Sequence, residues 1–279
     1  MITVAAFGST PDFSLLRNNK EDSQMQPNDP TNGVAFITGG GGGIGGATAE
    51  RLAAGGVAVV VTDFKADLAN SVAEKITSAG GEACAFALDV TNAEAVAETI
   101  NAAKAALGPI DYLVNTAGIF QWAPVEEISD AEFEEMFRVH VFGMHTVCRT
   151  ILPGMVERSS GAIVNITSIH PIRGQTLTAH YSAAKGAILA YTKSLAREKS
   201  PEGIRVNAVA PGPIDTPLWR GDMDADTLKD KMAERSNIIP MARLGTPEEV
   251  AAAIAFLLSP AASYMTGHIM TIDGGEVMN

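Results

Sequence analysis

From Val34 onward the sequence alternates short apolar runs with longer segments of helical periodicity, and this rhythm constrains the fold more than any other feature. The runs expected to form strands are Val34–Thr38, Val57–Thr62, Cys84–Leu88, Ile110–Asn115, Ala162–Thr167, Arg205–Ala210 and Ile269–Ile272. The helical patterns between them cover about 44–55, 67–79, 92–107, 130–157, 180–199 and 247–258. Strands that are apolar on both faces and separated by helices form a parallel sheet covered on both sides. The sequence therefore predicts an α/β protein with one doubly wound, seven-stranded parallel sheet in a single domain.

Two segments depart from this rhythm. Residues 1–32 are rich in Pro, Asn, Asp, Ser and Gln without sustained periodicity, which predicts an N-terminal extension, either disordered or laid over the main domain of residues 33–279. Residues 213–240 contain three prolines and then a charged, methionine-containing stretch, between a strand and the last helix. Ligands of doubly wound sheets bind at the carboxyl ends of the strands, so we expect a lid over 213–240, with a plain surface loop as the alternative.

Capping boxes mark the start of several expected helices. In such a box a Ser or Thr just before the helix pairs with a Glu three residues later. The pairs are Thr91 with Glu94, Ser129 with Glu132, and Thr246 with Glu249.

Composition narrows the class of function. A formal net charge of −12 disfavours contact with phosphate backbones, so nucleic acid is not an expected partner. The sequence has no apolar run of about 18 residues and no basic, apolar leader, so neither a membrane span nor a signal peptide is expected. We interpret Cys84 and Cys148 as reduced thiols of a cytoplasmic protein, and no Cys/His spacing indicates a metal site.

A glycine-rich run, Thr38–Gly46, separates the first expected strand from the first expected helix. Glycines permit a tight turn and let the backbone approach a pyrophosphate, while the helix N-terminus supplies free N–H groups and a favourable dipole. A glycine run alone also describes a flexible loop. Its place between strand and helix favours a dinucleotide site on a Rossmann-like sheet.

Asp63 closes the second expected strand, about twenty residues beyond the glycine run, where a carboxylate binds the hydroxyls of the adenosine ribose and repels a 2′-phosphate. Phe64 follows it, and Lys65 is the nearest cation. NAD is therefore expected in preference to NADP, although a solvated acid at a strand end is the alternative interpretation of Asp63.

Tyr181 and Lys185 stand four residues apart at the start of an expected helix, and therefore share one of its faces. A phenol with a pKa near about 10 is a poor base at neutral pH, but a nearby ammonium stabilises the phenolate. The pair can then act as a general acid and base for an alcohol proton. Ser168, at the end of a strand thirteen residues before the tyrosine, can hydrogen-bond the substrate oxygen.

These motifs together resemble those of the short-chain dehydrogenase/reductase superfamily, in its common single-domain subfamily, over about Gly33 to Gly275. The likeness rests on Thr38–Gly45, Asn115–Gly118, Ser168, Tyr181–Lys185, Pro211–Gly212, Arg243–Glu249 and Asp273–Gly275. The resemblance implies an NAD-dependent oxidoreductase that transfers a hydride between the nicotinamide and a secondary alcohol or ketone. It also implies a homotetramer, or a homodimer, in which long helices such as 130–157 pack between subunits.

The resemblance implies a role for each matching residue. Tyr181 is the acid and base, Lys185 lowers its pKa and holds the nicotinamide ribose, and Ser168 orients the substrate oxygen. The cofactor-binding residues implied are Gly39, Gly42, Gly43, Ile44, Gly45, Asp63, Phe64, Asp89, Val90, Asn115, Ala117, Gly118, Tyr181, Lys185, Pro211, Gly212, Ile214 and Thr216.

His140 departs from the family pattern, because it stands where the family has an asparagine that helps to hold a water linked to the lysine. An imidazole donates and accepts hydrogen bonds and titrates near neutral pH. We hypothesise that His140 serves the same relay as a fourth catalytic residue, with its own pH signature. The alternatives are a neutral histidine that only packs, and an impaired enzyme.

Three segments converge on the expected nicotinamide end and supply candidate substrate contacts: the stretch after the fourth strand, the stretch after Ser168, and the lid. The candidates are Gln121, Trp122, His170, Gln175 and Trp219, with Arg220 as a further group for an anion. Arg173 is left out because arginine is unremarkable there in the family, and a solvent-facing position is one option for His180. A sugar acid, a hydroxy acid, a cyclic alcohol and a steroid all remain compatible with this lining.

Two other functions compete with the dehydrogenase. One is a dinucleotide-binding homologue without turnover, in a regulatory or structural role, which only His140 supports. The other is a dehydratase or epimerase that uses bound NAD, although such relatives often carry a separate substrate domain that is missing here.

Overall fold

A computed structural model describes residues 29–221 and 223–278 of the chain. Seven strands form one parallel sheet in the order β3-β2-β1-β4-β5-β6-β7, which confirms the doubly wound, Rossmann-like domain expected from the sequence. The strands are β1 (Val34–Thr38), β2 (Ala58–Asp63), β3 (Ala83–Ala87), β4 (Tyr112–Asn115), β5 (Gly161–Ile166), β6 (Ile204–Pro211) and β7 (Ile269–Ile272). Most of the extension predicted over 1–32 lies outside the described residues.

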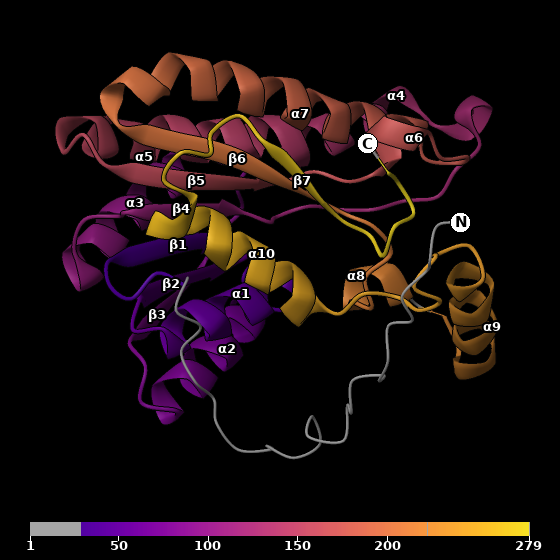
Figure 1. The fold of residues 1–279 in the computed structure, drawn as a ribbon, viewed down its shortest axis with the longest axis horizontal. Helices are drawn as coiled ribbons and strands as arrows, with labels where there is room; N and C mark the ends of the chain where they lie inside the picture. Colours follow the sequence, from indigo (N-terminus) through magenta and orange to yellow (C-terminus); the bar gives the residue numbers. More distant parts are fainter. Residues whose placement is uncertain (1–28, 222, 279) are drawn as a thin grey trace, which may run out of the picture.

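Helices cover both faces of this sheet, as Figure 1 shows. One face carries α1 (Gly43–Ala54), α2 (Ala66–Ser78) and α10 (Pro247–Leu258), and the other carries α3 (Ala93–Leu107), α5 (Met144–Glu157) and α7 (Ala179–Lys199). The first strand explains the layering, because all five of its residues are buried. Phe36 packs with the α3, α5 and α7 side, whereas Ile37 packs with the α1, α2 and α10 side. A strand apolar on both faces therefore requires two helical layers.

The long helix expected over 130–157 is divided into three parts. It begins as α4 (Asp130–Phe137), passes through a π-helical segment (Arg138–Gly143), and continues as α5. A π-helical turn accommodates one more residue than an α-helical turn, and such segments often occur at functional sites. The sequence pattern predicted the length of this helix but not its division.

Two of the three expected capping boxes are confirmed. At the starts of α4 and α10, the side chains of Ser129 and Thr246 accept hydrogen bonds from the backbone N–H groups of Glu132 and Glu249. The carboxylates of the two glutamates accept in return from the backbone N–H groups of Ser129 and Thr246. The prediction at Thr91 is wrong. The N-cap of α3 is Asn92, whose side chain accepts hydrogen bonds from two backbone N–H groups, because an Asn oxygen one residue later reaches the first turn.

The segment 213–240 contains two helices that the sequence pattern did not predict, α8 (Pro217–Arg220) and α9 (Ala225–Ser236). Its stems are held together, because the Asp215 N–H donates to the Gly245 carbonyl and the Gly245 N–H donates to the Pro213 carbonyl, both at 3.0 Å. The remaining short elements are α6 (His170–Arg173) and the 3-10 turns Val125–Glu127, Ser200–Glu202 and Pro260–Ala262.

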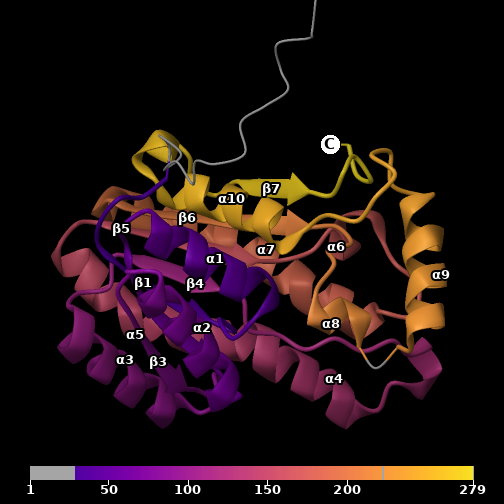
Figure 2. The same cartoon turned by 90° about the horizontal axis from the view of Figure 1, so that it is seen from below.

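The carboxyl ends of the strands face α8, α9, α6 and the start of α7, as Figures 1 and 2 show. The residues singled out in the sequence lie at this edge, where ligands of doubly wound sheets bind. None of the described helices is both long and apolar enough to cross a membrane. Within residues 29–221 and 223–278, no three His, Cys, Asp or Glu side chains gather as metal ligands would.

Candidate active site

The glycine loop is built for close approach of backbone to backbone. A Cβ on Gly45 would stand 2.2 Å from the Gly39 carbonyl oxygen, and a Cβ on Gly39, at φ +63°, would stand 2.8 Å from the Ala117 nitrogen. By contrast, a Cβ on Gly42 would meet no atom of the described protein within 4 Å. Gly42 is also the N-cap of α1. The loop therefore presents open space directly above a helix N-terminus, which fits a pyrophosphate.

Asp63 lies beside this loop at the end of β2. One carboxylate oxygen accepts a hydrogen bond from the Gly41 N–H at 3.1 Å, and the other accepts one from the Lys65 N–H at 3.0 Å. Next to it the Phe64 side chain is 75% exposed. The carboxylate is thus fixed at the rim of the loop, as an adenosine ribose would require.

The end of β4 closes the other side of the loop. The Thr116 hydroxyl donates to the Thr38 carbonyl, and the Ala117 N–H donates to the Thr38 hydroxyl at 3.3 Å. Asn115 is buried and donates its amide to Asn165 on β5 at 2.9 Å. Asn115 therefore ties the strands together beneath the site, while Ala117 and Gly118 form its floor.

The other cofactor candidates lie at the same edge. The Gly212 N–H donates to the Ile272 carbonyl at 2.9 Å, which places the turn after β6 against the end of β7. Ile214 and Thr216 are buried, and the Thr216 hydroxyl caps α8 by accepting from the Trp219 N–H at 3.2 Å. After β3, Val90 is buried, while Asp89 is exposed and binds Thr91.

Ser168, Tyr181 and Lys185 come together, as the sequence predicted. The Lys185 ammonium is buried, donates to the Ile166 carbonyl at 2.9 Å, and stands 5.6 Å from the centroid of the Tyr181 ring. The Ser168 oxygen accepts a hydrogen bond from the His170 N–H at 3.1 Å. This contact uses Ser168 only as an acceptor, so its hydroxyl proton can be donated to another oxygen.

Burial governs the ionisation of this pair. It raises the pKa of Tyr181 to about 12, although a hydrogen bond with Ser168 opposes the rise. Burial also lowers the pKa of Lys185 to about 7. Desolvation is thus the largest influence on the pKa of both side chains in the protein without cofactor, and the lowering of the Tyr181 pKa by Lys185 stays a prediction.

His140 is buried within the π-helical segment and faces the same site. Its Nε2 lies 2.7 Å from the Ile119 carbonyl and 3.1 Å from the Ile119 N–H, and its ring meets the Tyr181 ring edge to face at 5.5 Å. A Cβ on Gly118 would stand 2.3 Å from the imidazole, so glycine is needed to admit the ring. Burial first, and then the charge of Lys185, hold the pKa of His140 well below its usual value. This direction favours the neutral ring near neutral pH, and the expected pH signature of His140 stays a prediction.

An aromatic wall covers the substrate side of Tyr181. Phe120 packs edge to face against Tyr181 at 4.8 Å and against Trp122 at 4.9 Å, and the His170 ring stands 5.5 Å from Tyr181. Trp122 remains 50% exposed. The structure therefore brings two of the predicted substrate candidates, Trp122 and His170, close to Tyr181.

The other substrate candidates are engaged elsewhere. The Gln121 amide donates to Glu132 on α4 at 2.7 Å, and the Gln175 oxygen accepts from Arg173 at 2.5 Å. Trp219 lies on α8 and makes no ring contact with the aromatic wall among the described residues. Arg220 is half-exposed and forms a two-pronged ion pair with Asp215, at 2.7 and 2.9 Å.

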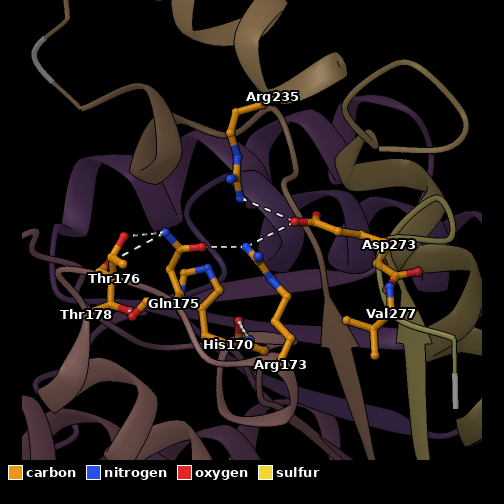
Figure 3. A network of polar contacts seen from close by, with 10 residues as sticks. His170, Arg173, Gln175, Thr176, Thr178, Arg235, Asp273 and Val277 are labelled. Atoms are coloured by element: carbon orange, nitrogen blue, oxygen red, sulfur yellow. Dashed lines mark hydrogen bonds and ion pairs between the residues drawn. The ribbon is translucent and has the colours of Figure 1, made fainter. Parts of the chain in front are cut away.

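Two interpretations at the rim of the site are corrected. His180 does not face solvent: it is fully buried against the protein, because it opens α7 toward α4. Arg173, which the sequence analysis set aside, joins Arg235 of α9 at the carboxylate of Glu276, with nitrogen–oxygen distances of 3.0 and 3.7 Å (Figure 3). No sequence pattern marked this cluster, because its members lie far apart in the chain.

Comparison with known proteins gives a consistent result. Residues 39–276 match the family described as enoyl-(acyl carrier protein) reductase. A cis-4-hydroxycyclohexanecarboxylate dehydrogenase from Sinomonas cyclohexanicum is 43% identical over 243 residues, which cover 87% of this chain and 95% of that protein. A 2-(S)-hydroxypropyl-CoM dehydrogenase from Xanthobacter autotrophicus is 38% identical, with 88% and 96% covered. A 3-oxoacyl-[acyl-carrier-protein] reductase from Chlamydia muridarum is 36% identical, with 88% and 97% covered.

A solved structure supports the same fold. A crystal structure described as ribose-5-phosphate isomerase from Brucella melitensis matches with a TM-score of 0.81 and 33% identity, covering 89% of this chain and 94% of that one.

Proposed function

The chain belongs to the short-chain dehydrogenase/reductase superfamily, and from that premise we propose that it is an NAD-dependent dehydrogenase of a small cyclic secondary alcohol. The relatives, which the chain covers over 95–97% of their length, are described as dehydrogenases and a reductase. The observation that carries the proposal is the convergence of Ser168, Tyr181 and Lys185 at the mouth of a glycine-lined dinucleotide cradle.

Each side chain has a role set by its contacts. Ser168, whose oxygen already accepts from the His170 N–H, donates its own proton to the substrate oxygen and orients it. Tyr181 takes the alcohol proton in the oxidation, or returns it in the reduction. Lys185, fixed by the Ile166 carbonyl, holds its ammonium close to the tyrosine ring and favours the phenolate. When bound, the nicotinamide supplies the hydride acceptor or donor.

The preference for NAD is proposed from Asp63. Its carboxylate is held at the rim of the glycine loop by two backbone N–H groups, so it cannot swing away from an incoming 2′-phosphate without losing both bonds. A ribose hydroxyl donates to a carboxylate, whereas a phosphate is repelled by it. Lys65 is exposed beside it and contributes only its backbone N–H to these contacts.

His140 is proposed as a positioning residue rather than a titrating one. Its Nε2 holds Ile119, two residues beyond Ala117 in the floor of the site, and its ring supports the Tyr181 ring. A protonated Nε2 donates to the Ile119 carbonyl and an unprotonated Nε2 accepts from the Ile119 N–H, so the neutral imidazole that burial favours can hold Ile119 in either tautomer. In this role the imidazole, which stands at the position of the family's asparagine, supports the loop after β4.

The cyclic alcohol is proposed from the aromatic wall. Phe120, Trp122 and His170 surround Tyr181 with ring edges and faces, which suit the flat, apolar body of a ring substrate. The relative that oxidises cis-4-hydroxycyclohexanecarboxylate, by its description, gives a first compound to test.

Assembly into a homotetramer, or a homodimer, is proposed from α5 and α7. These helices border a groove of about 430 Å³ on the outer face, whose apolar lining is Leu152, Pro153, Val156 and Leu195. Covering this groove with the same helices of a second copy buries its apolar atoms.

The first experiment mixes the purified protein with NAD, or with NADP, and a panel of cyclic alcohols, hydroxy acids and sugar acids, and follows the absorbance of the reduced cofactor. We expect NAD reduction with a cyclic secondary alcohol, and its loss in Tyr181→Phe. Binding of NADH without turnover of any alcohol or reduction of any ketone would favour the non-catalytic homologue, and product formation without net change of NAD would favour an epimerase or dehydratase.

A further inference from the structure

A cluster of two arginines around one buried carboxylate lies beside the aromatic wall. Glu276 is 3% exposed and follows the end of β7. Its place is set by Asp273, whose carboxylate accepts hydrogen bonds from the N–H groups of Gly275 at 3.0 Å and Val277 at 2.7 Å. This turn brings Glu276 to Arg173 of α6 and Arg235 of α9 (Figure 3).

The charges in this cluster do not balance. Two guanidinium groups share a single carboxylate, and the pairs are unequal, at 3.0 Å for Arg173 and 3.7 Å for Arg235. Arg173 also donates to Gln175, whereas Arg235 has only the longer contact with Glu276 among its described ion pairs. The described ion pairs thus place two positive charges on the single carboxylate of Glu276, while the nearby Asp273 carboxylate is bound by backbone N–H groups. Arginine forks of this kind bind carboxylates with two parallel hydrogen bonds.

The cluster is coupled to the catalytic site through His170. His170 and Arg173 are three residues apart on α6, and the His170 ring stands 5.5 Å from the Tyr181 ring. The pKa of His170 is lowered to about 4 by burial first, and then by the charges of Arg173 and Arg235. The two cations are thus close enough to act on a ring that lines the substrate side, and His170 itself adds no positive charge near neutral pH.

We propose that Arg173 and Arg235 select substrates that carry a carboxylate on the side of the ring opposite the reacting alcohol, with Glu276 as the internal anion that occupies the cluster when no substrate is bound. The proposal rests on the proposed function, whose active site it extends. Arg235 belongs to the lid segment and Arg173 to the loop after Ser168, so one substrate carboxylate would join the two. Binding of the substrate carboxylate would then also hold the lid segment against the loop after Ser168.

The test measures binding as well as turnover. Cyclohexanecarboxylate, which has no hydroxyl and cannot be oxidised, is titrated into the NADH-bound protein by calorimetry, with cyclohexanecarboxamide as the neutral control. In parallel, kcat/KM is measured for 4-hydroxycyclohexanecarboxylate and its carboxamide. We expect the wild type to bind the acid and to prefer it in turnover.

Arg235→Gln is the informative variant, because Arg173 remains to pair with Glu276. It should weaken binding of the acid about 10- to 100-fold, the effect of losing a hydrogen bond to a charged group, and leave the amide within about threefold. Arg220→Gln removes the same charge from the lid but from a pair with Asp215, so it serves as the matched control and should change neither ligand. Glu276→Gln should strengthen binding of the acid, because it removes the competing anion.

The outcomes separate the two proposals. Equal binding of acid and amide by the wild type, or equal losses for both in Arg235→Gln, would overturn the anion site even if an alcohol is oxidised. Binding of the acid that falls in Arg235→Gln and rises in Glu276→Gln would support the site even if no alcohol turns over, in which case the proposed function fails. A merely structural cluster predicts losses of the same sign in both variants.

Discussion

The cofactor side and the substrate side of this active site are built in different ways. The proposed cofactor side is shaped by backbone: the glycine loop, the N–H groups that hold Asp63, and the turn after β6, which bonds to the end of β7. On the substrate side they are made by side chains from separate segments, such as Phe120, His170 and Arg235. A site built from backbone is tied to the fold and changes little, whereas a site built from converging side chains can be altered one residue at a time.

Tyr181→Phe should have the largest effect, because this residue stands where the two sides meet. Loss of the phenol proton should lower kcat by about 10²- to 10⁴-fold while NADH binding stays within about threefold. The measurement is steady-state oxidation of the alcohol, with NADH fluorescence titration beside it. A large loss of NADH affinity would mean that Tyr181 belongs to the cofactor side.

Lys185→Met tests the cost of burial at this junction. Burial lowers the pKa of Lys185 from 10.5 to about 7, so the folded protein holds it less charged than the unfolded chain between those values. The penalty is complete below about pH 7 and disappears as the pH rises toward 10.5. At pH 7 the free energy of unfolding of Lys185→Met should therefore exceed that of the wild type by an amount on the order of several kcal/mol, and its melting temperature should be higher. The difference in melting temperature should become smaller by pH 10. A gap that is constant with pH would count against the depressed pKa.

Asp63→Ala should affect the cofactor side alone. The loss of the charged acceptor should lower kcat/KM for NAD about 10- to 100-fold and narrow the preference over NADP, while KM for the alcohol is unchanged. Initial rates with both cofactors at several alcohol concentrations measure this. An equal loss with NAD and NADP would show that Asp63 only supports the glycine loop.

A pair of alanine substitutions tests the backbone argument directly. Gly45→Ala forces a Cβ to within 2.2 Å of a carbonyl oxygen, so it should lower stability by about 1–3 kcal/mol. Gly42→Ala meets no protein atom within 4 Å and should leave stability unchanged, but its methyl group enters the space assigned to the pyrophosphate and should weaken NADH binding. Thermal melting and NADH titration of both variants separate the two effects. If Gly42→Ala bound NADH as the wild type does, the pyrophosphate would not lie over Gly42.

His140→Asn should have the smallest effect. Asparagine can hold Ile119 in its place, so substantial activity should remain, and the pH–rate profile near neutrality should not change, because burial holds the pKa of His140 well below its usual value. A profile that shifts near neutrality would restore a titrating role for this histidine.

The same contrast explains what the sequence could predict. The seven parallel strands, the glycine loop, Asp63 and the Ser168–Tyr181–Lys185 group follow from local patterns, because apolar strands, tight turns and helical spacing each leave a signature within a few residues. The cluster of Arg173, Arg235 and Glu276 has no such signature, since its members come from three segments that meet only in the folded chain. Helices α8 and α9 were also missed, because the prolines and charges of 213–240 obscured their short helical patterns.

The π-helical segment between α4 and α5 has a consequence for how this protein can change over generations. Each residue in a helix turns the chain by about 100°, so the extra residue of the π segment sets the rotation of everything that follows it along α5. The number of residues in the π-helical segment therefore sets both the direction of His140 and the direction of the outward groove on α5. Point substitutions can change either feature by itself, but a single-codon insertion or deletion in this segment would move both together, so pocket and outer surface are inherited as a unit.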